Sequence, residues 1–268
     1  MHLKASLNMY AWPEVQANLD HFWQLFQAQM ATDGYELQAQ LDHDESETIW
    51  HDDQLGLSQT CGYPLNHILG DSVTILGTPD YICDYANDGL YASVVLVRQS
   101  DGRKHLSEFK DSTVAINSLV SQSGYNALRN LLVEQNCINL DTPTFFAKGE
   151  LSGGHRQSIQ AVASGLADIC TVDPISFALA QQFEVAAESL KVIDCTASTP
   201  GLPLICSPSL FADAAQLTAY KQAIHKAWGL AGADPVSAPL LLGNMVEIPR
   251  AAYSAVARHA LSLFGETI

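Results

Sequence analysis

The chain has 268 residues, of which 47% are hydrophobic and 16% are charged, and its formal net charge is −16. This composition is typical of a globular protein and excludes an intrinsically disordered chain. The acidic excess argues against nucleic acid or an anionic membrane surface as a partner, because both require clustered lysine and arginine. No apolar run approaches the roughly 18 residues of a membrane span, so we expect no membrane insertion.

Short apolar runs and one long helical pattern make up the first third of the chain. A strand is predicted over residues 3–9, and Pro13 then opens a helix whose apolar residues recur at helical spacing as far as Gly34. Runs rich in branched residues predict further strands over residues 54–60, 73–79 and 91–98.

Strands and helices alternate from residue 112 onward. Further strands are predicted over residues 112–117, 142–149, 167–173, 190–196 and 202–207. Helices are predicted over residues 123–135, 153–165, 174–183, 211–228 and 249–264. This alternation predicts mixed, mostly parallel sheets flanked by helices, and the strands are too many for one small sheet, so we expect two α/β lobes.

Two stretches are candidate crossovers between the lobes: the polar residues 98–112 and the Pro/Gly-rich residues 198–203. If both are crossovers, one lobe is inserted into the other. Lobe 1 then comprises residues 1–93 plus 198–268, and lobe 2 comprises residues 94–197. A ligand would bind in the cleft between them.

The turn Ser121-Gln122-Ser123-Gly124-Tyr125 separates a predicted strand from a predicted helix. Ligands of open α/β sheets bind at such strand ends, and a helix N-terminus offers free N–H groups and the positive end of the dipole. Gly124 would let a ligand approach the backbone closely. A helix cap requires only one serine, so we favour an anion site built from neutral donors.

Two further turns repeat this pattern. Gly153 and Gly154 precede a helix start that carries His155, and Ser58-Gln59-Thr60 ends a strand before Gly62. His155 taken alone is better explained as a surface residue of a first helical turn. Three such turns in one chain favour an anion site more than any one of them does.

No catalytic signature occurs: the chain lacks a Walker loop, G-x-S-x-G, H-E-x-x-H and a post-strand G-x-G-x-x-G. Asp173, at the end of a predicted strand and before Pro174, is equally well explained as a functional carboxylate or as a helix cap. The acidic stretch 41–53 is interpreted as a solvated loop, and the six cysteines as unpaired thiols in a reducing compartment. We therefore expect no metal and no cofactor.

Taken together, the segments 57–64, 91–98, 114–129, 152–173 and 198–205 resemble the phosphate/phosphite/phosphonate-binding proteins of ABC transporters. The resemblance implies a two-lobed, type II periplasmic-binding-protein fold. It also implies a non-catalytic function: a monomeric solute-binding protein that closes over a small oxyanion for an ABC permease.

The resemblance assigns ligand contacts residue by residue. Ser121, Gln122 and Ser123 would bind the tetrahedral anion, and His155 would contact the same anion. Tyr91 would line the cleft, and Tyr10, Gln59 and Thr60 would close it from lobe 1. With Gly124 and Asp173, these residues form the predicted ligand site.

The sequence departs from the family pattern where aminophosphonate binders carry carboxylates for the ligand amine. Leu202 stands in the turn that would hold one acid, and Ile175 stands where another is expected. We therefore expect phosphate, phosphite or a simple phosphonate as the ligand. The resemblance implies a periplasmic location, whereas the N-terminal residues show no secretory signal, which favours the cytoplasm.

Two other functions remain as alternatives. One is an enzyme of the lyase type on the same fold, with Asp173 or His155 as the general acid or base. The other is a cytoplasmic ligand-sensing module that transmits lobe closure to a partner protein.

Overall fold

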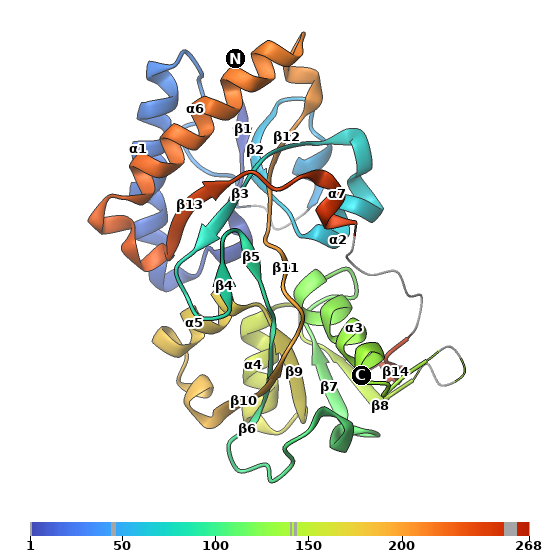
Figure 1. The fold of residues 1–268 in the computed structure, drawn as a ribbon. Coiled ribbons are helices and arrows are strands. Elements are labelled where there is room, and N and C mark those ends of the chain that lie inside the picture. The colour runs from blue at the N-terminus through green and yellow to red at the C-terminus, as the bar shows by residue number, and fades with distance from the viewer. Residues whose placement is uncertain (1, 44–46, 140, 142–143, 255–261, 268) are drawn as a thin grey trace. The chain divides into compact units, whose positions relative to one another are not determined.

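The structure is a computed structural model that describes the chain except residues 1, 44–46, 140, 142–143, 255–261 and 268. The chain forms two compact units, each with its own sheet and helices (Figure 1). Unit 1 comprises Met1–Ile82, Asn87–Leu90 and Pro200–Tyr253. Unit 2 comprises Cys83–Ala86, Tyr91–Thr199 and Ser254–Ile268. The expected α/β fold class is confirmed.

Unit 1 contains a five-stranded sheet of order β1-β2-β12-β3-β13. Its strands are β1 (Lys4–Ala5), β2 (Leu55–Gln59), β12 (Leu204–Cys206), β3 (Thr74–Tyr81) and β13 (Leu242–Val246). β1 and β2 are parallel, whereas β12 runs antiparallel to β2 and β3, and β13 runs antiparallel to β3. β12, which the chain forms after it returns from unit 2, therefore lies in the centre of this sheet.

Two long helices of unit 1, α1 (Gln16–Thr32) and α6 (Ala214–Gly232), pack side by side (Figure 1). Their contact is aromatic: the ring centroids of Phe22 and Trp228 are 5.1 Å apart. Both side chains are almost completely buried, so this contact anchors α6 to α1. The shorter helices of the unit are α2 (Gly62–Pro64), which continues as a π-helical turn, and α7 (Arg250–Tyr253).

Unit 2 contains a six-stranded sheet of order β10-β6-β9-β7-β8-β14. Its strands are β10 (Leu190–Cys195), β6 (Val94–Arg98), β9 (Ile169–Val172), β7 (Thr113–Ile116), β8 (Phe146–Leu151) and β14 (Phe264–Thr267). The pairs β9–β7, β7–β8 and β8–β14 are parallel, and β6 is antiparallel to both β10 and β9. Parallel pairs thus predominate in unit 2, and antiparallel pairs predominate in unit 1.

Three helices of unit 2 begin just after a strand or its turn. A π-helical turn (Gln122–Asn126) continues directly into α3 (Ala127–Glu134). α4 (His155–Ser164) follows β8, and α5 (Pro174–Phe183) follows β9. Strand side chains such as Val95, Val114 and Ile169 are fully buried in the core of this unit. Because β7, β8 and β9 are mutually aligned, the first turns of the three helices lie at the same edge of the sheet.

The C-terminal segment differs from the sequence-based expectation. A helix was expected over residues 249–264, but α7 ends at Tyr253, and Phe264 begins strand β14. Residues 255–261 lie outside the described residues. β14 pairs in parallel with β8, which places this segment in unit 2, whereas the expected lobe 1 included it. The pairing partner is more than a hundred residues away in sequence, so local periodicity cannot reveal it.

The unit boundaries also lie at other residues than the expected lobe boundaries. A small sheet of order β11-β5-β4 contains the segments at which the chain passes between units: β4 (Ala86–Asn87), β5 (Leu90–Tyr91) and β11 (Thr199–Pro200). The passage at residues 199–200 falls within the expected crossover 198–203. The earlier passages occur between residues 82 and 91, and the expected crossover 98–112 lies wholly within unit 2.

Candidate functional site

The polar turn after β7 is the N-terminal cap of a helix. Ser121 has an extended backbone, and its Oγ accepts a hydrogen bond from the N–H of Gly124 at 3.1 Å. The five residues from Gln122 to Asn126 are all buried. The expected cap is therefore present, and it uses only Ser121, which leaves Gln122 and Ser123 available for another role.

Gly124 is required by its neighbours. A Cβ atom at this position would lie 1.9 Å from Asn117 Oδ1 and 3.2 Å from His155 Cε1. Asn117 follows β7 directly, so the end of this strand, the turn and the start of α4 are packed against one another at Gly124. The glycine was predicted to admit a ligand. The structure shows that it also admits the Asn117 side chain, a residue that the sequence did not single out.

His155 connects two of the predicted residues in unit 2. Its Nε2 lies 2.9 Å from Ser123 Oγ and 3.1 Å from Asp173 Oδ2. The side chains of His155 and Asp173 are only 13% and 3% exposed. His155 is the first residue of α4, so burial and the positive end of the helix dipole both disfavour its charged form. Burial lowers the pKa of His155, and the Asp173 carboxylate opposes this only in part.

Asp173 caps a helix and also contacts His155. Its Oδ1 accepts a hydrogen bond from the N–H of Ser176 at 2.8 Å and so caps α5. Its other carboxylate oxygen faces His155. The helix cap is therefore confirmed, and because a carboxylate has two oxygens, the cap does not exclude the functional role, which stays a prediction.

Several buried polar atoms near these residues have no hydrogen-bond partner among the described residues. They are Nδ1 of His155, both amide atoms of Gln122 and Oγ of Ser93. Val94 pairs with Val172, so Ser93 and Asp173 adjoin the same rung at the end of the sheet. Buried polar atoms without a partner are rare and costly, and a cluster of them at helix N-termini is typical of a ligand site. Ser93 was missed because nothing in its local sequence marks it.

The side chains of Asn126 and Arg129 hold the turn that begins at Ser121 in place. The Nδ2 of Asn126 donates to the carbonyl oxygen of Ser121 at 2.8 Å, and Arg129 donates to Oδ1 of Asn126 at 2.6 Å. Asn126 and Arg129 are both buried, and the Arg129 guanidinium lies 5.6 Å from the centre of the Tyr125 ring. This chain of contacts fixes the position of Ser121 and therefore of the helix start.

The predicted residues of unit 1 form a separate group with a different character. The Nε2 of Gln59 donates to the Tyr81 hydroxyl at 3.0 Å and to the carbonyl oxygen of Leu202 at 3.2 Å. Tyr10 packs edge-on against Tyr81, with ring centroids 5.2 Å apart. Thr60 is fully buried, and its Oγ1 has no partner in the described part of the chain. Tyr81, which joins Gln59 to Tyr10, was not predicted.

The structure thus groups the predicted residues by unit. In unit 2 it brings together Ser121, Gln122, Ser123, Gly124, His155 and Asp173. In unit 1 it brings together Tyr10, Gln59 and, as the next residue along the chain, Thr60. Tyr91 is buried at the end of β5. Within the described residues, no cluster of side chains is suited to hold a metal ion.

Two α/β units whose polar turns lie at strand ends and helix N-termini define the class of two-domain solute-binding proteins. A family profile described as the periplasmic substrate-binding protein of ABC phosphonate transporters matches residues 57–238. The chain therefore belongs to this family, whose members are the phosphonate-binding components of ABC transporters.

Solved structures show the same fold at low sequence identity. A binding protein component of an ABC phosphonate transporter from Pseudomonas aeruginosa matches with a TM-score of 0.66 and 18% identity, over 91% of this chain and 80% of the other. PhnD1 from Prochlorococcus marinus, in complex with methylphosphonate, matches with a TM-score of 0.66 and 16% identity, over 94% of each chain.

XAC2383 from Xanthomonas citri, bound to ATP, matches with a TM-score of 0.63 and 14% identity, over 94% of each chain. A search of the curated proteins found no match. No helix in the described ranges combines the length and the apolar character needed to cross a bilayer.

Proposed function

We propose that the chain binds phosphate, phosphite or a simple phosphonate without changing it chemically, and that it delivers this solute to an ABC permease in the periplasm. The solute would bind to the group of residues that we call the cradle: Ser121, Gln122, Ser123, Gly124, His155 and Asp173. We further propose that units 1 and 2 are the two lobes of the fold, and that Tyr10, Gln59, Thr60 and Tyr91 also contact the solute.

One observation carries the proposal: His155 Nε2 lies between Ser123 and Asp173 while its buried Nδ1 has no partner among the described residues. A carboxylate only accepts hydrogen bonds, so the contact with Asp173 is attractive only if Nε2 carries the hydrogen. Ser123 Oγ can then accept from the same N–H, and its own hydroxyl hydrogen is free to donate to an oxyanion. Asp173 would act by fixing the tautomer of His155.

This tautomer has a consequence for binding. In the neutral ring Nδ1 has a lone pair and no hydrogen, so it cannot donate to a fully deprotonated oxyanion. Either the solute supplies a hydrogen or His155 takes one up. Because burial lowers the pKa of His155 in the free protein, a bound dianion would raise this pKa again, and binding would be coupled to the uptake of a proton.

The same geometry argues against a nucleophilic enzyme. In a Ser-His-Asp relay, serine and aspartate contact different nitrogens of the imidazole, so that the ring can accept the serine proton while the aspartate stabilises the resulting charge. Here both groups contact Nε2. Ser123 is therefore not activated by a base, which fits a site that binds and releases its ligand unchanged.

Two features narrow the choice of solute. Leu202 is buried, and its backbone oxygen accepts a hydrogen bond from Gln59. Because the leucine side chain is apolar, it offers no charge to a ligand amine. The net charge of −16 disfavours long-range attraction of anions, so affinity must arise from short-range donors in a desolvated site. We therefore expect methylphosphonate to bind at least as tightly as 2-aminoethylphosphonate.

Isothermal titration calorimetry with phosphate, phosphite, methylphosphonate and 2-aminoethylphosphonate tests the proposal. The expected result is saturable binding of at least one of the first three, with no heat of turnover after saturation. Absence of binding by all of them at millimolar concentration would refute the assignment. Clearly tighter binding of the aminophosphonate would refute the argument from Leu202.

A further inference from the structure

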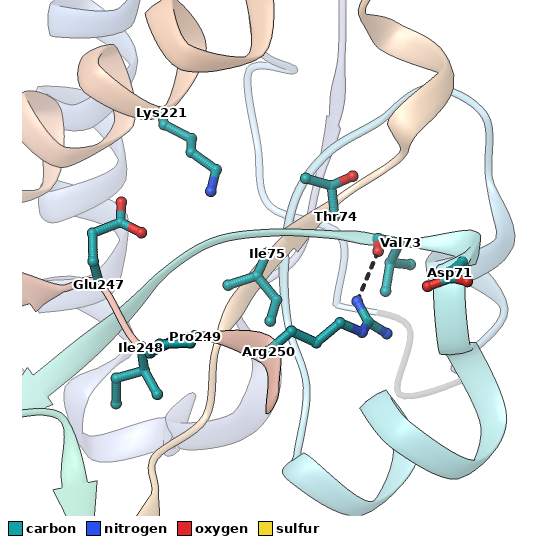
Figure 2. Close-up of a pocket in the computed structure, with 9 residues that line it drawn as sticks. All are labelled: Asp71, Val73, Thr74, Ile75, Lys221, Glu247, Ile248, Pro249 and Arg250. Carbon is teal, nitrogen blue, oxygen red and sulfur yellow. Dashed lines mark hydrogen bonds between the residues drawn. The ribbon is translucent and has the colours of Figure 1, made fainter. Parts of the chain in front are cut away.

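A cavity of about 470 Å³ lies in unit 1, apart from the residues predicted to contact the solute. It is lined by the start of β3, by Lys221 of α6 and by the segment 247–250 that follows β13 (Figure 2). Thr74 in this cavity pairs with Cys206, at one end of β12, whereas Gln59 pairs with Leu204 at the other end. Tyr10, Gln59 and Thr60 do not line it.

The cavity exists because β13 covers only part of β3. β13 pairs with β3 from Thr78 to Tyr81, and after Val246 the chain leaves the ladder. Pro249 cannot extend the ladder, since it has no N–H to donate. Within the described residues, the first residues of β3 therefore have β12 on one side and no strand on the other. Side chains of Ile75 and Ile248 form an apolar part of the wall (Figure 2).

Two cations face this cavity, and neither forms an ion pair with a described residue. Arg250 donates to the carbonyl oxygens of Val73 and Leu65, each at 3.2 Å, and also to that of Gly70. These acceptors are neutral carbonyl oxygens, so none of them offsets the positive charge of the guanidinium. Lys221 Nζ has no hydrogen-bond or ion-pair partner in the described part of the chain, and Figure 2 shows it extending from α6 towards β3.

Some other cations of the chain are paired with carboxylates. Lys226 lies 3.1 Å from Asp33, and Arg156 lies 2.8 Å from Glu184. The acids beside the cavity do not neutralise its cations in this way. Asp71 is exposed, and the Glu247 side chain is 63% exposed and faces His225. Water solvates these two rim carboxylates, whereas Lys221 and Arg250 are half-buried.

We propose that this cavity is a second binding site, which takes a small organic anion with a carboxylate or phosphate group and an apolar body. The anionic group would be bound by Lys221, by the Thr74 hydroxyl and by the positive field of Arg250. The body would pack on Ile75 and Ile248. The volume is within the range of sites for small organic ligands and exceeds the need of a bare inorganic ion.

NMR titration of the backbone amides with benzoate, phenyl phosphate and inorganic phosphate tests this proposal. The titrations are run in the wild-type chain and in a Ser123→Ala/His155→Ala variant, so that binding at the cradle does not interfere. Benzoate or phenyl phosphate is expected to shift the amides of Thr74, Ile75, Lys221 and Ile248 in both proteins. Inorganic phosphate is expected to bind there at least about tenfold more weakly, because it has no apolar body.

Three variants make the test specific. Lys221→Gln is expected to weaken the binding of the organic anion about tenfold, and Lys221→Arg to retain most of it. Lys110→Gln removes an exposed cation of unit 2 and is expected to leave affinity unchanged. No shift at the four amides, a response that disappears in the cradle variant, or equal affinity in Lys221→Gln would each overturn the proposal. Failure of solute binding at the cradle would leave this result unaffected.

Discussion

The two groups of predicted ligand residues differ in how their polar atoms are held. In unit 2, Ser123 and Asp173 both contact His155, and the three residues lie at helix starts. In unit 1, the amide of Gln59 is already bonded to the Tyr81 hydroxyl and to a backbone oxygen. The difference supports our proposal, in which unit 2 supplies oriented donors for an anion and unit 1 supplies an aromatic, preformed wall.

The largest effect is expected from removing two donors of unit 2 together. Each hydrogen bond to a charged solute contributes about 1.5–3 kcal/mol, so Ser123→Ala/His155→Ala should weaken binding of methylphosphonate by about 10²- to 10⁴-fold. Calorimetry measures the affinity. Thermal unfolding of the free protein measures separately the stability lost because the buried Asp173 carboxylate no longer contacts His155.

The matched control for this variant is Ser100→Ala/His43→Ala, which removes the same two residue types at exposed positions. It should bind as the wild type does. An affinity of the Ser123/His155 variant within threefold of that of the control would contradict the role assigned to unit 2.

The second prediction concerns pH and the tautomer of His155. A complex that holds one proton more than its separated components weakens as pH rises, by up to about tenfold per pH unit once solute and histidine are both deprotonated. Calorimetry between pH 7 and 9, in buffers of different ionisation enthalpy, measures the affinity and the proton uptake. An affinity independent of pH in this range would exclude proton-coupled binding.

Asp173→Asn sharpens this test. Asparagine caps a helix as well as aspartate does, so α5 should remain intact. Its amide can donate to Nε2 of His155, which moves the hydrogen of the neutral ring to Nδ1. The variant should therefore bind the dianion with a smaller pH dependence than the wild type. An unchanged pH profile would show that Asp173 does not control the tautomer.

The third prediction concerns the packing at Gly124. In Gly124→Ala the new methyl group would overlap Asn117 Oδ1, and overpacking of this kind lowers stability by about 1–3 kcal/mol. Chemical denaturation measures this loss. Gly102→Ala is the control, because a Cβ there meets no atom within 4 Å. Gly124→Ala combined with Asn117→Ala should recover part of the loss, and no recovery would mean that the overlap with Asn117 is not its cause.

The smallest effect is expected in unit 1. Tyr81→Phe removes one neutral acceptor from Gln59, which still bonds to the oxygen of Leu202, so affinity should fall by no more than about fivefold. Tyr35→Phe, a tyrosine of the same unit that packs on Tyr220, serves as control. A loss as large as that of the Ser123/His155 variant would remove the distinction between the two units.

The sequence predicted those parts of the cradle that local patterns encode. Strand endings, serine caps and glycine-bearing turns are local signals, so the positions of Ser121, Ser123 and His155 could be predicted. Ser93 and Tyr81 could not, because each reaches its group through strand pairing or ring packing between distant segments. Strand β14 was missed for the same reason, since it forms by pairing with β8, which is distant in the sequence.

Nitrogen-15 NMR of the His155 imidazole, with and without methylphosphonate, tests the central claim most directly. In the free protein the ring should be neutral, with its hydrogen on Nε2 and none on Nδ1. In the complex both nitrogens should carry hydrogen, as the bound anion accepts from Nδ1. Saturation with methylphosphonate that leaves the His155 resonances unchanged would contradict the assignment of the cradle as the solute site.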